Sequence, residues 1–116
     1  MSLRLRFDCV FYYVSDLDRA IQFYCDMLGL ALTSRDAVAR FDIDGVLFEL
    51  VPADDPAQLS GQGNARLTLA VDDIHQVAAE LASRGMTVSD IHQVSNGLLA
   101  AFNDPDGNEI VLWQYT

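Results

Sequence analysis

The sequence is poor in basic residues and in cysteine, and each shortage argues against a class of protein. Seven Lys and Arg residues stand against 17 Asp and Glu residues, which gives a formal net charge of −10. Nucleic acid and anionic membrane surfaces are bound through Lys and Arg, so neither is an expected partner. Two cysteines do not make a disulfide framework, and a reduced, cytoplasmic setting is therefore expected.

Long apolar runs are also missing. No stretch approaches the ~20 apolar residues that a membrane-spanning helix needs. The N-terminal residues lack the apolar run and the small-residue cleavage site of a secretory signal. The chain has 116 residues, of which 51% are hydrophobic, and we expect it to fold as a single domain with its own core.

What is present is an alternation of strand-like and helix-like segments, which predicts an α+β fold. In the first half, the helix is expected to begin at the N-cap Asp16 and to stop at Gly29. The turn Asp44-Gly45 is typical of a two-residue hairpin. The strands predicted in this half cover residues 7–14, 30–34, 37–43 and 46–51.

The second half repeats this pattern after a loop at residues 52–63 that is rich in Pro, Gly and Asp. Here the helix is expected to begin at the N-cap Asp72 and to stop at Gly85. Asn96-Gly97 is predicted as one turn and the segment 104–107 as another. The predicted strands cover residues 65–71, 86–94, 98–102 and 109–115.

The spacing between the two halves is nearly constant. Val14-Ser15-Asp16-Leu17 matches Val71-Asp72-Asp73-Ile74 at a distance of 57 residues, and the stops Gly29 and Gly85 lie 56 residues apart. A near-constant distance across strand, cap, helix and stop indicates an internal repeat. The sequence therefore predicts two βαβββ modules at about 5–52 and 64–116, joined by a linker at 53–63.

Two segments resemble signatures of one family. YVSDLDRAIQFY at 13–24, followed by Leu28-Gly29-Leu30, resembles the opening of the vicinal oxygen chelate superfamily, the group of glyoxalase I, bleomycin resistance protein and extradiol dioxygenase. The segment 104–108, DPDGN, resembles the second signature of that group. The resemblance implies two modules whose sheets form an incomplete barrel around a cleft that holds a small molecule. It also implies a homodimer.

The resemblance further implies four metal ligands, usually His, Glu or Gln, on the inner faces of four strands. The matching positions here are Cys9, Glu49, Arg66 and Val111. A guanidinium only donates hydrogen bonds, so Arg66 cannot ligate a cation, and Val111 has no lone pair. His75 and His92 are expected at the surface and supply no ligand set. We therefore expect no metal and no other cofactor.

Without a metal, the same strand faces are expected to form a ligand pocket that is mostly apolar and aromatic. Glu49 and Arg66 either form an ion pair or anchor a polar group of the ligand. Cys9 is more typical of a small buried hydrophobe than of a nucleophile. The residues predicted to face the ligand, by strand alternation, are Cys9, Phe11, Tyr13, Leu47, Glu49, Arg66, Thr68, Glu109 and Trp113.

The favoured function is a metal-independent protein that binds a small molecule. The acidic composition favours a cationic ligand, and Tyr13 and Trp113 favour an aromatic one. Two alternatives stay open. One is a metal-dependent lyase or isomerase similar to glyoxalase I, or a dioxygenase. The other is a metal-free enzyme that uses Glu49 as a general base.

Overall fold

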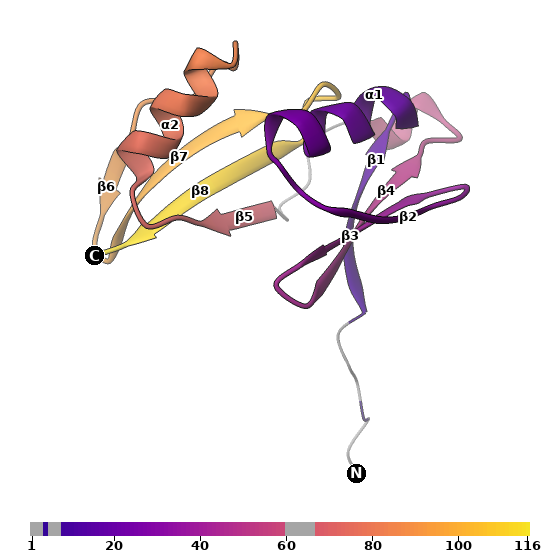
Figure 1. The fold of residues 1–116 in the computed structure, drawn as a ribbon, viewed down its shortest axis with the longest axis horizontal. Helices are drawn as coiled ribbons and strands as arrows, with labels where there is room; N and C mark the ends of the chain where they lie inside the picture. Colours follow the sequence, from indigo (N-terminus) through magenta and orange to yellow (C-terminus); the bar gives the residue numbers. More distant parts are fainter. Residues whose placement is uncertain (1–3, 5–7, 60–66) are drawn as a thin grey trace. The chain divides into compact units, whose positions relative to one another are not determined.

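The computed structural model describes residues 4, 8–59 and 67–116. The chain divides into two compact units, Met1–Ala53 and Asp54–Thr116, and each contains one sheet and one α-helix (Figure 1). None of the helices in the described ranges is long and apolar enough to cross a membrane. The predicted cleft between the modules, the homodimer and the cytoplasmic setting stay predictions, and Arg66 lies outside the described residues.

The first unit forms a four-stranded sheet in the order β1-β4-β3-β2. The pair β1–β4 is parallel, whereas β4–β3 and β3–β2 are antiparallel. Along the chain the elements are β1 (Cys9–Val14), α1 (Leu17–Gln22), the π-helix η1 (Phe23–Met27), β2 (Leu32–Arg35), β3 (Ala39–Ile43) and β4 (Val46–Pro52).

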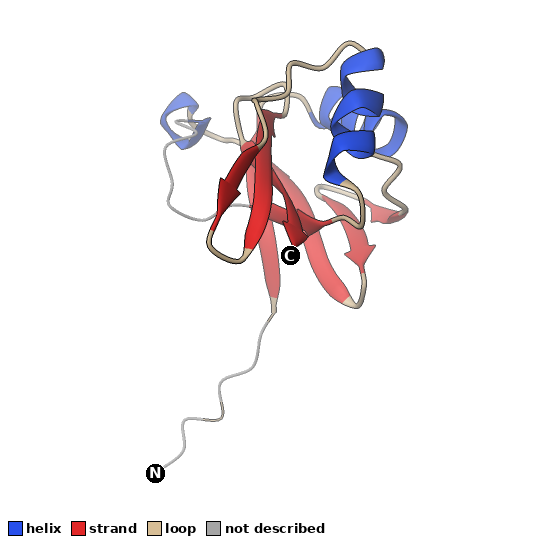
Figure 2. Cartoon of the chain, turned by 90° about the vertical axis from the view of Figure 1, so that its left-hand side faces the viewer, coloured by secondary structure: helices blue, strands red, loops and turns tan. Residues whose placement is uncertain are grey.

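The second unit repeats this topology in the order β5-β8-β7-β6, again with the first and last strands parallel. Its elements are the 3₁₀-helix η2 (Pro56–Leu59), β5 (Leu67–Ala70), α2 (Ile74–Ser83), β6 (His92–Val94), β7 (Gly97–Asn103) and β8 (Glu109–Tyr115). In Figure 2, η2 is the short blue helix beside the grey trace. The predicted βαβββ repeat is confirmed, and both sheets are open.

Buried aromatic rings join the helix of the first unit to its sheet. Tyr24, in η1, is fully buried, and its ring centroid lies 5.3 Å from that of Phe48 and 6.1 Å from that of Phe41. Tyr12 of β1 meets Phe48 edge-on at 5.8 Å. Burying rings of this size supplies about 1.5–3 kcal/mol each, so this cluster contributes to the stability of the unit.

The helix boundaries follow the predicted caps with one correction. Asp16 accepts a hydrogen bond from the Arg19 N–H, and Gly29 ends the segment at a φ of +73°. In the second unit the N-cap is Asp73, which accepts from the Gln76 N–H, so the prediction of Asp72 was wrong by one residue. Asp73 is the residue 57 positions after Asp16, so the repeat spacing identified the cap that the local pattern misplaced.

Two strand boundaries in the second unit also differ from the prediction. The segment predicted as strand 86–94 is a regular strand only over His92–Val94, although the Ser89 N–H still donates to the Ala101 carbonyl at 2.8 Å. Upstream, the Ser89 hydroxyl accepts from the Ala101 N–H at 2.8 Å, so a side chain takes the place of a backbone acceptor. The predicted Asn96-Gly97 turn lies at residues 95–96, because Gly97 already pairs with Val94 as the first residue of β7.

The predicted turn before the last strand is held by one buried carboxylate. Asp104 is 5% exposed, and its oxygens accept from the N–H groups of Asp106 and Asn108 and from the Asn108 side-chain amide, at 2.8–2.9 Å. Gly107 completes the turn at a φ of +83°. This turn sets where β8 begins, and therefore which residues of β8 point to each face.

We expect Asp104→Ala to lower the free energy of unfolding by about 2–3 kcal/mol, because the partly buried donors would lose their acceptor. Urea denaturation monitored by circular dichroism measures this loss. The matched control is Asp90→Ala at an exposed carboxylate, with an expected change within about 0.5 kcal/mol. Equal effects of the two substitutions would show that Asp104 does not hold the turn.

Candidate functional site

Each sheet packs one face against the helix of its own unit and turns the other face away from it. Helix α1 contacts β4, and α2 contacts β7 and β8. We call the face turned away from the unit's own helix the open face. Because side chains alternate along a strand, the buried residues Phe48 and Leu50 mark the helix face, and their neighbours Leu47 and Glu49 mark the open face.

The structure places five of the predicted ligand-facing residues on the open face of the first unit. Cys9 and Phe11 lie on β1 beside Leu47 and Glu49 of β4, and Tyr13 lies further along β1. Phe11 is 45% exposed and meets the Tyr13 ring edge-on at a centroid distance of 5.2 Å. An aromatic pair therefore adjoins a carboxylate on this face.

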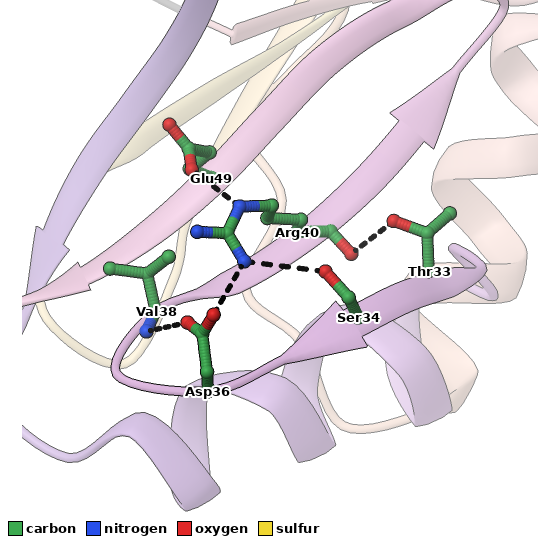
Figure 3. Close-up of polar contacts among 6 residues, drawn as sticks. All are labelled: Thr33, Ser34, Asp36, Val38, Arg40 and Glu49. Carbon is green, nitrogen blue, oxygen red and sulfur yellow. Dashed lines mark hydrogen bonds and ion pairs between the residues drawn. The ribbon is translucent and has the colours of Figure 1, made fainter.

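Glu49 is paired with Arg40 of the neighbouring strand β3. Its Oε2 lies 3.1 Å from Arg40 Nε, and its side chain is 18% exposed (Figure 3). Phe11, Glu49 and Arg40 are direct neighbours across β1, β4 and β3, so they form one row over the sheet. The carboxylate at the centre of this face thus has a cationic partner from within the same unit.

The guanidinium of Arg40 makes further contacts toward the edge of the sheet. Arg40 Nη1 donates to Asp36 Oδ2 at 3.1 Å and to Ser34 Oγ at 3.4 Å. The Val38 N–H, and then Arg40, lower the pKa of Asp36, while the carboxylates of Asp36 and Glu49 raise the pKa of Arg40. The ion pair is therefore part of a polar network, one end of which reaches the edge strand β2 (Figure 3).

The other end of this network is the thiol of Cys9. The hydrogen bond to Glu49, followed by burial and by the charges of Glu49 and Asp8, raises the pKa of Cys9 to about 11. The carboxylate accepts the S–H and disfavours a second negative charge beside it. Cys9 therefore stays a protonated thiol near neutral pH, which is the opposite of what a nucleophilic cysteine needs.

Arg40, the partner of Glu49 on this face, is the residue that the sequence analysis missed. The Asp44-Gly45 turn was predicted, and its two-residue length sets Ile43 opposite Val46. Counting back along both strands from that pair brings Arg40 opposite Glu49, so the signal was present in the hairpin register. The partner considered instead was Arg66, which lies outside the described residues.

The open face of the second unit has no counterpart of the Glu49–Arg40 ion pair among its described residues. Thr68, Glu109 and Trp113 lie on it, as predicted from strand alternation. Val111, which matches Glu49 in the repeat, faces Ala101 across β7 and β8. The ion pair of the first unit thus corresponds to two apolar side chains in the second.

Trp113 lies over a glycine on this face. A Cβ atom at Gly97 would come within 2.4 Å of Trp113 Cζ2, so only glycine leaves room for the indole. The Tyr115 ring meets Trp113 edge-on at 5.6 Å and is 73% exposed. Among the residues that the structure describes, none accepts a hydrogen bond from the buried Trp113 Nε1.

The donor set fits a metal ion poorly. Within the described ranges no three His, Cys, Asp or Glu side chains come together as ligands. Glu49 already binds a guanidinium and a protonated thiol, and Val111 offers no lone pair. His75 and His92 are both exposed, as expected.

Comparison with known proteins agrees with the topology. The family model described as "Glyoxalase/Bleomycin resistance protein/Dioxygenase superfamily" matches residues 6–112. A "Probable lactoylglutathione lyase" of Synechocystis sp. is 30% identical over 117 residues, covering 87% of this chain and 88% of its own. "Glutathione transferase FosA" of Serratia marcescens is 29% identical over 104 residues, covering 85% of this chain and 73% of its own.

Solved structures of similar fold come from the same group of proteins. TnmS3, "an antibiotic binding protein" from Streptomyces sp. CB03234, is 28% identical with a TM-score of 0.81, and the match covers 100% of both chains. Lactoylglutathione lyase from Agrobacterium tumefaciens is 19% identical with a TM-score of 0.76, covering 97% of this chain and 96% of its own, which is a likeness of fold alone.

We expect Glu49→Gln to make Cys9 more reactive toward iodoacetamide, because the main cause of its raised pKa is removed. At about pH 8 the alkylation rate should rise several-fold, up to about tenfold, since a larger thiolate fraction outweighs the lower nucleophilicity of each thiolate. Peptide mass spectrometry resolves Cys9 from Cys25, which is the internal control. An unchanged ratio of the two rates would contradict the Cys9–Glu49 contact.

The same raised pKa predicts a loss of stability in alkali. The folded-state pKa of about 11 lies above the ordinary value of 9.0, so this contribution is complete below about pH 9 and is lost as the pH rises toward 11. Wild type should therefore lose more stability between pH 9 and 11 than Cys9→Ser. Thermal melting of both proteins over this range measures the difference, and parallel curves would refute it.

We expect Gly97→Ala to destabilise the protein by about 1–3 kcal/mol, because the new methyl group would collide with the indole at 2.4 Å and with the Gln114 carbonyl oxygen at 2.7 Å. The loss of stability caused by Gly97→Ala should be smaller in a Trp113→Phe background, because the phenylalanine ring does not reach the position of the new methyl group. A double-mutant cycle in urea measures this coupling. Additive effects would mean that the ring does not rest on Gly97.

Proposed function

Because the chain belongs to the glyoxalase/bleomycin resistance protein/dioxygenase superfamily, we propose that it is a metal-independent protein that binds a small molecule at the open faces of its sheets. The observation that carries this proposal is the engagement of Glu49 by Arg40 Nε at 3.1 Å. Glu49 occupies a position where the family resemblance implies a metal ligand, and an internal cation already neutralises it.

A metal ion would have to displace this cation. Binding at Glu49 would require the carboxylate to leave Arg40, which is always charged and would lose one of its two carboxylate partners. It would also require ligands from Cys9, whose pKa is about 11, and from Val111, which has none. These costs favour ligand binding without a metal.

The composition of both open faces supports small-molecule binding. Ligand pockets combine apolar and aromatic side chains with a few polar groups, and the pairs Phe11–Tyr13 and Trp113–Tyr115 supply the aromatic part. The antibiotic-binding TnmS3 is similar over its full length. The proposed ligand-binding residues are Cys9, Phe11, Tyr13, Leu47, Glu49, Arg66, Thr68, Glu109 and Trp113.

The ligand class we propose is an aromatic compound, neutral or cationic. The net charge of −10 disfavours anions by long-range repulsion. An exposed phenylalanine and a half-buried tryptophan favour flat rings, which they contact by stacking or edge-on packing.

A second candidate is catalysis, because two similar proteins carry enzyme names. In that case Glu49 is the candidate general base of a metal-free reaction. Its contacts with Arg40 and the Cys9 thiol argue against this role, since a general base needs a free carboxylate oxygen and both partners occupy its oxygens. Retained ligand binding with lost turnover in Glu49→Gln would favour the enzyme.

We expect chelator-treated protein to be stabilised by planar aromatic compounds. A ligand at one hundred times its Kd adds about 2.7 kcal/mol to the stability of the folded state, which raises Tm by several degrees. Trp113 is the one tryptophan of the chain, so quenching of its fluorescence reports binding at the second unit directly.

The control is the same panel with added zinc, nickel or manganese, which should leave the shifts unchanged. Elemental analysis of the purified protein should find less than one tenth of an equivalent of metal. Stoichiometric metal that is lost in Glu49→Gln would overturn the proposal in favour of a metalloenzyme. The absence of any shift across neutral and cationic aromatic compounds would overturn small-molecule binding itself.

A further inference from the structure

We infer that Arg40 is a ligand-binding residue that holds an uncharged carbonyl or hydroxyl oxygen of an aromatic ligand through its Nη2 group. This inference rests on the proposed function and names the group that the polar part of the first open face recognises. It assigns to Arg40 a role beyond neutralising Glu49.

The hydrogen bonds and the ion pair of the Arg40 guanidinium use two of its three nitrogens. Arginine has five N–H donors, one on Nε and two on each terminal nitrogen. Nε faces Glu49, and Nη1 donates to Asp36 and Ser34. In Figure 3 the third nitrogen points away from these partners, and no residue in the described part of the chain accepts from it.

The two carboxylates also fix the orientation of this group. Glu49 lies on β4 and Asp36 follows β2, so the guanidinium is held from both sides of its own strand β3. The Arg40 side chain is still 34% exposed, and a ligand can therefore reach it. A donor that is held in place before binding loses little conformational entropy when it meets an acceptor.

The charges around Arg40 select the kind of acceptor. One guanidinium stands between the carboxylates of Glu49 and Asp36, so the cluster carries an excess negative charge. A carboxylate or phosphate on the ligand would be repelled by both acidic side chains. A carbonyl or hydroxyl oxygen accepts the same hydrogen bond without that repulsion.

The apolar part of the ligand has a place on the same row. Arg40 and Phe11 lie on either side of Glu49, two strand spacings apart, which is about 10 Å. Phe11 is 45% exposed, with Tyr13 edge-on to it. A ligand of two or three fused rings spans this distance with its ring on Phe11 and its oxygen at Arg40.

The test compares fluorene with 9-fluorenone, two flat tricyclic compounds that differ in one carbonyl oxygen. Titration followed by two-dimensional NMR gives both dissociation constants and shows that each variant is folded. We expect wild type to bind 9-fluorenone about tenfold more tightly than fluorene, as one hydrogen bond to a charged donor allows. A 9-fluorenone that carries a carboxylate should bind more weakly than 9-fluorenone itself.

Arg40→Met should remove the preference for 9-fluorenone and leave the fluorene affinity within about twofold. Arg40→Lys keeps the charge beside Glu49 but lacks the planar fork, so it should also lose most of the preference. The matched control is Arg35→Met in β2, since Arg35 pairs with Asp18 and its side chain is similarly exposed, at 43%. This control should keep the wild-type preference.

The outcomes separate the two proposals. If both compounds bind and Arg40→Met keeps the tenfold preference, the role of Arg40 is refuted while small-molecule binding stands. If the preference disappears equally in Arg35→Met, the effect is one of general charge, and the inference is also refuted. If neither compound binds, both the inference and the proposed aromatic ligand are wrong.

Discussion

The parallel pairing of the first and last strands is the constraint on which each unit depends. A parallel pair cannot be closed by a tight turn, so the chain between β1 and β4, or between β5 and β8, has to cross the sheet. A helix and two antiparallel strands make that crossing in both units. The pairing brings together residues that are about 40 positions apart, such as Phe11 and Glu49, and so decides the composition of each open face.

Within this shared topology the two units differ in their chemistry. The row of Phe11, Glu49 and Arg40 in the first unit contains a complete ion pair, whereas Val111 and Ala101 stand at the matching positions of the second. A half-buried carboxylate without a partner costs several kcal/mol. The two facing positions are therefore stable when they hold two opposite charges, as in the first unit, or two apolar side chains, as in the second. The duplicated fold thus has one polar open face and one that is mainly apolar and aromatic.

Strand alternation was sufficient to predict the faces, because the period of two residues is local and β8 begins at the predicted residue. The ends of the helices could also be predicted from the sequence, since each depends on one capping side chain or on one glycine with a positive φ. Arg40 was missed because its meeting with Glu49 depends on register between strands. The end of the regular strand at His92 could not be predicted, because it depends on the Ser89 hydroxyl accepting from Ala101 of another strand.

The difference between a metal ion and an arginine at Glu49 is chemical as well as electrostatic. A metal ion accepts electron pairs and can bind and polarise a substrate oxygen, whereas a guanidinium only donates hydrogen bonds in fixed directions. With its Nε and Nη1 held by two carboxylates, Arg40 can orient a ligand but cannot supply Lewis-acid chemistry. The arginine at this position of the fold therefore supports the proposal that the first open face recognises a ligand and does not break a bond in it.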